Sequence, residues 1–218
     1  MTVSASSSKG AAGRISLLVV DDHPIVRAGL RDLIADQPDL VIVAEAENGE
    51  RAVAQFRDVR PDVTLMDLRM PVMGGPEAIR CIRAEFPEAR IIALTSYGGD
   101  ADIRRALYAG ARGYLMKDML PTEVVAAIRA VSRGERAIPV AVAIRLAEHP
   151  ELDGLTPREL EVLEYVARGF GNRKISEAIG RTDETVKLHV KNIFRKLNVD
   201  SRTAAVSVAL VRGLVHLP

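Results

Sequence analysis

Five polar residues of this sequence could together bind a cation and a phosphoryl group, because each lies where a short apolar run ends. Asp21 and Asp22 follow the first run, Asp67 ends the third, Thr95 the fourth and Lys117 the fifth. Three carboxylates brought together repel one another by about 4 kcal/mol per pair at ~4 Å in an effective dielectric constant of about 20. One lysine cannot offset three negative charges, so an oxygen-preferring divalent cation is expected, and Mg²⁺ fits best.

A cation beside an ammonium group, a hydroxyl and one accessible carboxylate is the set of groups that phosphoryl transfer requires. The cation and Lys117 can bind phosphoryl oxygens while Asp67 attacks in line, and the expected product is an aspartyl phosphate. Asp21 and Asp22 also have a simpler interpretation as residues that begin a helix before Pro24. Capping accounts for only one of the two, so the presence of all five residues at run ends favours phosphoryl chemistry.

The apolar runs are predicted to be the strands of a doubly wound, five-stranded parallel α/β sheet. Each run is unbroken rather than alternating, which is typical of strands buried on both faces, and helical patterns separate the runs. In the strand order 2-1-3-4-5 the first and third strands are neighbours, so their carboxylates converge at one edge. The predicted strands are residues 15–20, 40–46, 63–66, 91–94 and 113–116, and the predicted helices are residues 24–35, 49–57, 76–86, 100–109 and 121–133.

Residues 15–133 resemble the receiver domains of two-component response regulators, which have a flavodoxin-like fold. The similarity is carried by the stretches LLVVDDHPIVRAGL, VTLMDLRMPVMGG, IIALTSY and GARGYLMKD. It implies that Asp67 is the phosphoacceptor, that Lys117 binds the phosphoryl group, and that Thr95 and Tyr114 form a switch pair. Periodicity alone would make Tyr114 an ordinary aromatic residue of a strand.

The same resemblance implies a set of Mg²⁺ ligands. Asp22, Asp67 and the backbone carbonyl of Arg69 would bind the metal directly, and Asp21 would bind it through water. Asp118 stands where many receivers have proline, so the backbone of that loop is not implied by the family pattern. The role of the preceding lysine is unaffected by this difference.

From residue 155 onward the sequence is helical in pattern, with four predicted helices. Thr156, Pro157 and Glu159 form a capping box with proline at the first helical position. Asn172 is predicted to cap the second helix and Thr182 the third, after a tight turn. Residues 168–212 contain ten lysines and arginines against four acidic residues, although the net charge of the whole chain is only +1. A polyanion would bind at this segment.

The third of these helices has an apolar side and a basic side. Its apolar residues recur at helical spacing and are predicted to face the core: Val186, Val190, Ile193 and Leu197. Lys187, Lys191 and Arg195 lie on the opposite side, which is the arrangement by which a helix-turn-helix domain enters a major groove. A solvated charged face is the commoner meaning of such spacing. The absence of interleaved acidic residues after Glu184 favours DNA.

Residues 155–213 resemble the LuxR-type helix-turn-helix domain of the NarL/FixJ class of regulators. The similarity is carried by LTPRELEVLEYVARG, NRKISEAI, TDETVKLHVKNIFRKLNV and SRTAAV. The DNA contacts that follow from the resemblance and the basic stripe are Lys187, Leu188 and Lys191 in the groove, Thr185 and Arg173 at phosphates, and Arg195. Residues 201–212 would be the dimerisation helix. Gly171 and Ser176 depart from the family pattern, which affects one backbone contact and not the fold.

With 218 residues, the chain is expected to hold two compact domains. The predicted organisation is a disordered tail (1–13), a receiver domain (14–133), a linker with a short helix (134–154) and an all-α, four-helix helix-turn-helix domain (155–218). A single cysteine and the absence of an apolar run of about 18 residues predict a cytoplasmic bacterial protein that does not enter a membrane. The four histidines show no metal-ligand spacing.

The combined hypothesis is a response regulator rather than an enzyme, with self-phosphorylation and self-dephosphorylation at Asp67 as its only chemistry. A sensor histidine kinase or a small phosphodonor would phosphorylate it in the presence of Mg²⁺. Phosphorylation would promote a homodimer that binds an inverted-repeat promoter site on double-stranded DNA, with RNA polymerase as a further partner.

Two alternatives to this hypothesis remain. One is a receiver-like DNA-binding regulator that acts without phosphorylation. The other is an aspartate-based phosphohydrolase, which is disfavoured because Arg69 stands where that chemistry needs a second aspartate. Dinucleotide enzymes are excluded because no glycine-rich loop follows the first predicted strand.

Overall fold

The computed structural model describes residues 13–96, 99–140, 142–144 and 155–215. These residues form two compact units, the first made of the described residues up to Ser96 together with Arg104–Ala143, and the second of the rest. The predicted tail, apart from Gly13, lies outside the described residues, as do residues 141 and 145–154 of the predicted linker. No helix in the described part of the chain is both long enough and apolar enough to cross a membrane.

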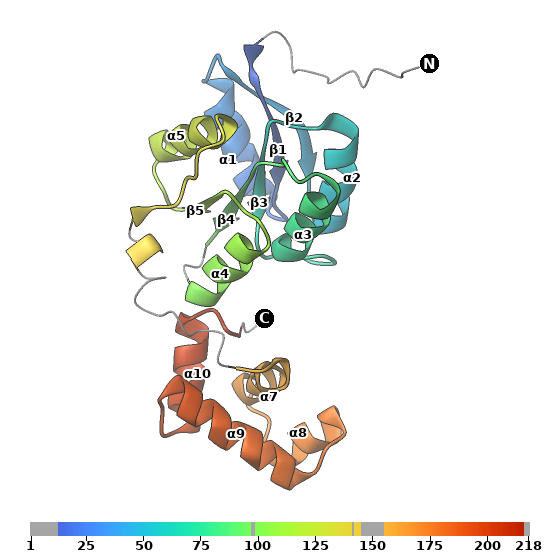
Figure 1. Ribbon diagram of the computed structural model, residues 1–218, viewed down its shortest axis with the longest axis vertical. Coiled ribbons are helices and arrows are strands. Elements are labelled where there is room, and N and C mark those ends of the chain that lie inside the picture. The colour runs from blue at the N-terminus through green and yellow to red at the C-terminus, as the bar shows by residue number, and fades with distance from the viewer. Residues whose placement is uncertain (1–12, 97–98, 141, 145–154, 216–218) are drawn as a thin grey trace. The chain divides into compact units, whose positions relative to one another are not determined.

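The first unit contains the five-stranded parallel sheet that the apolar runs predict, in the order β2-β1-β3-β4-β5 (Figure 1). Its strands are β1 (Ile15–Val20), β2 (Leu40–Ala46), β3 (Val63–Asp67), β4 (Ile91–Thr95) and β5 (Gly113–Met116). The helices that alternate with them are α1 (Pro24–Ala35), α2 (Gly49–Val59), α3 (Gly75–Glu85), α4 (Asp100–Tyr108) and α5 (Pro121–Ser132). The predicted fold and strand order are confirmed, and the ends of the elements differ from the predicted ones by at most two residues.

The sheet is buried on both faces, as its unbroken apolar strands predict. One face is covered by α1 and α5, and the other by α2 and α3 (Figure 1). Every residue of β3 and β4 is buried, including the polar Thr64, Asp67 and Thr95. Since all strands are parallel, with Asp67 opposite Leu94 and Thr95 opposite Met116, their carboxyl ends lie along one edge.

The second unit contains four helices, α7 (Pro157–Ala167), α8 (Asn172–Ile179), α9 (Asp183–Leu197) and α10 (Arg202–Val211). The capping box at the start of α7 is confirmed, because the Thr156 hydroxyl accepts from the Glu159 backbone N–H and the Glu159 carboxylate accepts from that of Thr156. Thr182 caps α9 by accepting from the backbone N–H of Thr185. Both caps fix where the chain turns into a helix.

The predicted cap at Asn172 is wrong. Gly171 occupies the N-cap position of α8 and has no side chain to offer, while Asn172 is the first helical residue. Its carboxamide oxygen instead accepts a hydrogen bond from Arg202 at 3.4 Å, so the side chain connects α8 to α10. Beneath these helices lies an apolar core to which α9 contributes Val186, Ile193 and Leu197, with Val190 packed at its margin.

Candidate functional site: an acidic pocket and a basic helix

Lys117, directly after β5, contacts the polar residues at the ends of β1 and β3. Lys117 Nζ lies 2.6 Å from Asp21 Oδ2 and 2.9 Å from Asp67 Oδ2. The two carboxylate side chains are 0% and 4% exposed, and that of Lys117 is 13% exposed. Residues 21, 67 and 117 are far apart in the sequence, so the parallel sheet alone brings them together.

Burial and Lys117 have opposite effects on the pKa of Asp67. Burial raises the pKa of the Asp67 carboxyl group above its ordinary value, the ammonium group of Lys117 lowers it, and the neighbouring Asp21 raises it further. The backbone N–H of Arg69 donates to Asp67 Oδ1 at 3.3 Å, which also favours the carboxylate. For Lys117, burial lowers the pKa, but its hydrogen bonds to Asp21 and Asp67 outweigh burial and raise the pKa above the usual value.

The backbone at the start of α3 packs closely against the backbone of Asp67 and holds it in place. A Cβ atom on Gly75, at the start of α3, would lie 2.1 Å from the carbonyl oxygen of Asp67 and 2.8 Å from the Cα of Leu68. Neither atom can move without displacing β3. The backbone N–H of Gly75 donates to the carbonyl of Leu68 at 3.1 Å, so the absent side chain lets α3 begin directly against the end of the strand.

Two further residues of the pocket were missed by the sequence analysis. Arg27, on α1, donates from Nη1 to the backbone carbonyl of Asp21 at 2.6 Å and pairs with Glu45 at 3.3 Å. The arginine therefore ties the end of β1 to α1 and β2. Its place one turn after the acidic pair, at the start of a helix, was a signal available in the sequence.

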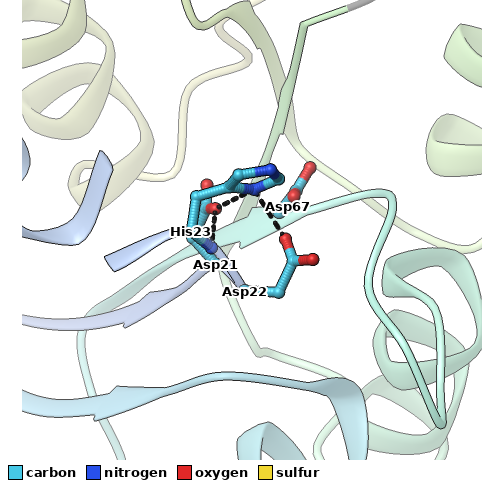
Figure 2. Close-up of side chains that lie close together, drawn as sticks. All are labelled: Asp21, Asp22, His23 and Asp67. Carbon is cyan, nitrogen blue, oxygen red and sulfur yellow. Dashed lines mark hydrogen bonds and ion pairs between the residues drawn. The ribbon is translucent and has the colours of Figure 1, made fainter. Parts of the chain in front are cut away.

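The second missed residue is His23, whose ring lies over the acidic pair (Figure 2). His23 Nδ1 lies 3.2 Å from Asp21 Oδ1 and 2.8 Å from Asp22 Oδ1, and the His23 backbone N–H donates to Asp21 Oδ1 at 2.9 Å. His23 is itself the N-cap of α1, without a side-chain cap, and no acidic residue lies in the first turn. The interpretation of Asp21 and Asp22 as simple helix-start residues is thus not supported.

The cluster has the composition of a divalent-cation site. Asp21, Asp22, His23 and Asp67 each offer one ligand atom, and these four atoms lie within 4.8 Å of one another. The three carboxylates have one partly buried ammonium group beside them, in contact with two of the three, which leaves excess negative charge. Asp22 Oδ1 is buried and makes no hydrogen bond, and the His23 ring lies 2.8 Å from it, so a cation could share it. These residues fit a hard, oxygen-preferring ion such as Mg²⁺.

The predicted switch residues lie in adjoining strands of the sheet. Thr95 is the last residue of β4 and is 1% exposed. Tyr114 is the second residue of β5, pairs in register with Ala93 of β4, and is completely buried. The position of Thr95 at the strand end is consistent with a hydroxyl beside the acidic pocket, and its role stays a prediction.

On α9 of the second unit, the predicted DNA-contacting residues form an exposed face. Lys187, Lys191 and Arg195 are exposed, and so is the apolar Leu188, at 58%. Thr185 is half-buried, and its hydroxyl lies 2.9 Å from that of Thr182. The basic stripe that the spacing predicts is therefore on the surface.

Two of the predicted DNA-contacting side chains have acidic partners on their own helix. Lys187 Nζ lies 2.9 Å from Asp183 Oδ2, one turn earlier on α9. Arg173, on α8, lies 3.4 Å from Glu177 Oε1 and is otherwise highly exposed. Asp183, which precedes Lys187 by one turn, was missed because the prediction considered only acidic residues after Glu184. The hydrogen bond to Asp183 raises the pKa of Lys187 above its ordinary value.

Comparison with known proteins identifies both units. Residues 17–129 match the family "Response regulator receiver domain", and residues 153–209 match "Bacterial regulatory proteins, luxR family". The response regulator protein VraR of Staphylococcus aureus (strain N315) is 38% identical over 207 residues, which are 93% of this chain and 99% of VraR.

Two solved structures of full-length regulators are also similar. The response regulator ChrA of a heme-sensing two-component system is 34% identical, with a TM-score of 0.56 over 93% of this chain and 99% of that one. RcsB of Salmonella enterica serovar Typhimurium, solved bound to a promoter in the presence of the phosphomimetic BeF3-, is 28% identical, with a TM-score of 0.67 over 89% of this chain and 97% of that one.

Proposed function

Because this chain belongs to the two-component response regulators with a luxR-family DNA-binding domain, we propose that phosphorylation of Asp67 controls its binding to DNA. The observation that carries the proposal is the contact of one partly buried ammonium group with two buried carboxylates that follow or end different strands. Lys117 Nζ lies 2.9 Å from Asp67 and 2.6 Å from Asp21, inside a cluster with excess negative charge. A structural ion pair needs only one carboxylate.

The pocket gives each residue a distinct role in the reaction. A carboxylate oxygen of Asp67 attacks the phosphorus of a phosphohistidine or of a small acyl phosphate, and the bond from phosphorus to the donor breaks. Lys117 opposes the effect of burial on the pKa of Asp67 and afterwards would balance the charge of the phosphoryl group. The Thr95 hydroxyl would follow the new phosphoryl oxygens, and Tyr114 would move into the space that Thr95 leaves.

A bound Mg²⁺ would supply positive charge to the phosphoryl oxygens, and the residues that would hold it are Asp22, Asp67 and the carbonyl of Arg69, with Asp21 through water. The excess negative charge of the cluster and the buried Asp22 Oδ1 support this assignment. Apart from transfer to and from its own Asp67, the chain needs no catalytic activity. It would act in the bacterial cytoplasm, where a sensor histidine kinase and DNA are both accessible.

The second unit would read DNA through α9. Lys187, Leu188 and Lys191 would reach base edges in the major groove, while Thr185, Arg173 and Arg195 would contact the backbone or the groove edge. RcsB was solved on promoter DNA with a phosphomimetic present, and we propose the same coupling here. A two-fold dimer, with α10 at its interface, would bind an inverted repeat and could there recruit RNA polymerase.

Intact-mass measurement after incubation with acetyl phosphate tests the proposal. In the presence of Mg²⁺ we expect a gain of one phosphoryl group, and with EDTA in place of Mg²⁺ we expect almost none. The phosphorylated protein should then sediment as a dimer and bind an inverted-repeat operator more tightly than the unmodified protein. No gain in mass with Mg²⁺ would favour a regulator that acts without phosphorylation, and equal affinity of both forms would remove the coupling.

A further inference from the structure

His23 is the one residue of the acidic cluster that offers nitrogen. Resting on the metal site of the proposed function, we propose that His23 Nδ1 is a direct ligand of the cation. The site would then hold nitrogen-accepting divalent ions such as Ni²⁺ and Co²⁺ more tightly than an all-oxygen set would. The inference assigns a metal ligand and a metal preference to a residue that phosphoryl transfer itself does not use.

The spacing of His23 Nδ1 from its neighbours is the spacing of ligands around one ion. With metal–ligand bonds of about 2.1 Å, adjacent ligands of an octahedral ion lie about 3.0 Å apart and opposite ligands about 4.2 Å apart. Nδ1 lies 2.8 Å from Asp22 Oδ1 and 3.2 Å from Asp21 Oδ1. The complete set with Asp67 lies within 4.8 Å, so a shift of a few tenths of an ångström closes it.

The contact between His23 and Asp22 has a further property that points to an ion. Asp22 Oδ1 is buried and makes no hydrogen bond, although His23 Nδ1 is only 2.8 Å away. The same Nδ1 also lies 3.2 Å from Asp21 Oδ1, within hydrogen-bonding distance, so one ring nitrogen faces two carboxylate oxygens. The ring is exposed and reachable from solvent, and its Nδ1 and the two carboxylate oxygens are spaced as neighbouring ligands of a cation would be (Figure 2).

The chemical nature of the ligand atoms decides which ions bind more tightly when His23 is a ligand. Carboxylate and carbonyl oxygens suit Mg²⁺, whereas imidazole suits later divalent metals such as Ni²⁺ and Zn²⁺, and affinities at mixed sites generally rise from Mn²⁺ to Cu²⁺. A nitrogen in the first coordination shell should therefore matter little for Mg²⁺ and a great deal for Ni²⁺. The competing idea is that a protonated His23 takes the place of the cation, in which case removing the ring would make every ion bind more tightly.

Pulsed electron paramagnetic resonance of Mn²⁺ bound to the full-length protein tests the assignment directly. We expect hyperfine coupling to a histidine ¹⁴N in the wild type, and its loss in His23→Ala and His23→Gln. His189→Ala, which removes a histidine from α9, should keep the coupling. Mn²⁺ bound without nitrogen coupling in the wild type would overturn the inference.

Calorimetric titration gives an independent readout with two ions. His23→Ala should weaken Ni²⁺ binding by about tenfold and change Mg²⁺ binding by less than about threefold. His23→Gln, which keeps a polar side chain of similar length, controls for a local change at the start of α1. Tighter binding of both ions in His23→Ala would instead establish His23 as a competitor of the metal.

These outcomes are separable from failure of the proposed function. Phosphorylation at Asp67 in the presence of Mg²⁺, without nitrogen coupling to Mn²⁺, refutes only the role of His23. Nitrogen coupling without phosphorylation leaves His23 a ligand and removes the phosphoryl chemistry.

Discussion

Two lysine–aspartate ion pairs in this molecule have the same separation and different surroundings. Lys117 Nζ lies 2.9 Å from Asp67, and Lys187 Nζ lies 2.9 Å from Asp183. The side chains of the first pair are 13% and 4% exposed, whereas those of the second are 57% and 42% exposed. The distance between the charges therefore does not determine how much each pair contributes to stability. The exposure of the pair to solvent determines it.

In the receiver unit the charges have lost their water, so each depends on its partner. Burial raises the pKa of Asp67 above its ordinary value, and Lys117 opposes that rise. In the helix-turn-helix unit, water and salt already solvate both groups of the pair, and the lysine can exchange its partner for DNA. Buried charge suits a site that must hold a small ion and a phosphoryl group, while exposed charge suits a surface that must bind and release a polyanion.

The largest expected effect is the loss of phosphorylation in Asp67→Asn. The amide has almost the shape of the carboxylate but cannot attack phosphorus, so the variant should fold and gain no phosphoryl mass with acetyl phosphate and Mg²⁺. Asp58→Asn, which changes an exposed aspartate of α2, should be phosphorylated like the wild type. If Asp67→Asn is still modified at the wild-type rate, another residue is the phosphoacceptor.

Lys117→Met should lower the free energy of unfolding by about 3 kcal/mol at neutral pH in EDTA, because it leaves two buried carboxylates without their ammonium group. The expected loss of stability is at the low end for a buried ion pair because the Lys117 side chain is 13% exposed. Lys187→Met, which breaks the exposed pair, should change the urea midpoint only slightly.

The effect of pH follows from the raised pKa of Asp67. A carboxyl group with a raised pKa in the folded state binds its proton more tightly there, so its ionisation costs stability as pH rises through that pKa. Loss of Lys117 raises the pKa of Asp67 further, and the deficit of Lys117→Met should shrink between pH 7.5 and pH 5. A deficit that is the same at both pH values would mean that Lys117 stabilises the fold through packing.

Gly75→Ala tests how closely the backbone encloses Asp67. Its Cβ would lie 2.1 Å from the carbonyl oxygen of Asp67, so β3 and α3 must separate, and we expect a loss of about 2 to 3 kcal/mol in urea denaturation. Gly29→Ala is the matched control, since no atom lies within 4 Å of its Cβ. In the middle of α1, that change should stabilise the protein by about 0.5 to 1 kcal/mol. Equal effects of the two substitutions would contradict the close approach.

The strand order and the residues at the strand ends could be predicted from the sequence, whereas contacts that depend on the path of a loop could not. The sheet and its order were predictable because unbroken apolar strands separated by helices allow few arrangements, and that order places Asp21, Asp67 and Lys117 together. The contacts of His23 were not predictable, because they depend on how α1 leaves β1, whereas the place of Arg27 at the start of the helix after the acidic pair was a usable signal. The cap at Asn172 was predicted wrongly because a helix start one residue earlier satisfies the same backbone groups.

Lys191→Ala should have a smaller effect, confined to DNA binding. If Lys191 donates to guanine acceptors, the variant should lose about 1 to 3 kcal/mol on its specific operator and much less on scrambled DNA. Arg173→Ala should weaken binding to both duplexes alike and lower the salt slope by about 0.9, because it removes a phosphate contact. Titrations of both variants at several salt concentrations measure this difference. Equal weakening of both duplexes by Lys191→Ala would make Lys191 a backbone contact.

The smallest expected effect is that of Asp183→Asn, and it separates the two kinds of ion pair most sharply. The substitution takes from Lys187 its partner at 2.9 Å and removes a negative charge from the face that meets DNA. Because the pair is exposed, the urea midpoint should hardly change, whereas the variant should bind both specific and scrambled DNA more tightly at low salt. The gain should fade as salt screens the charges.

Glu164→Gln provides the control, since it removes one exposed negative charge from α7 and not from α9. It should leave DNA binding almost unchanged. Asp183→Asn in a Lys187→Met background should give a smaller gain than in the wild type, because no lysine remains to be released. Weaker specific binding in Asp183→Asn would mean that Asp183 holds Lys187 in its reading position. The exposed pair would then resemble the buried one, since each charge would be needed to place the other.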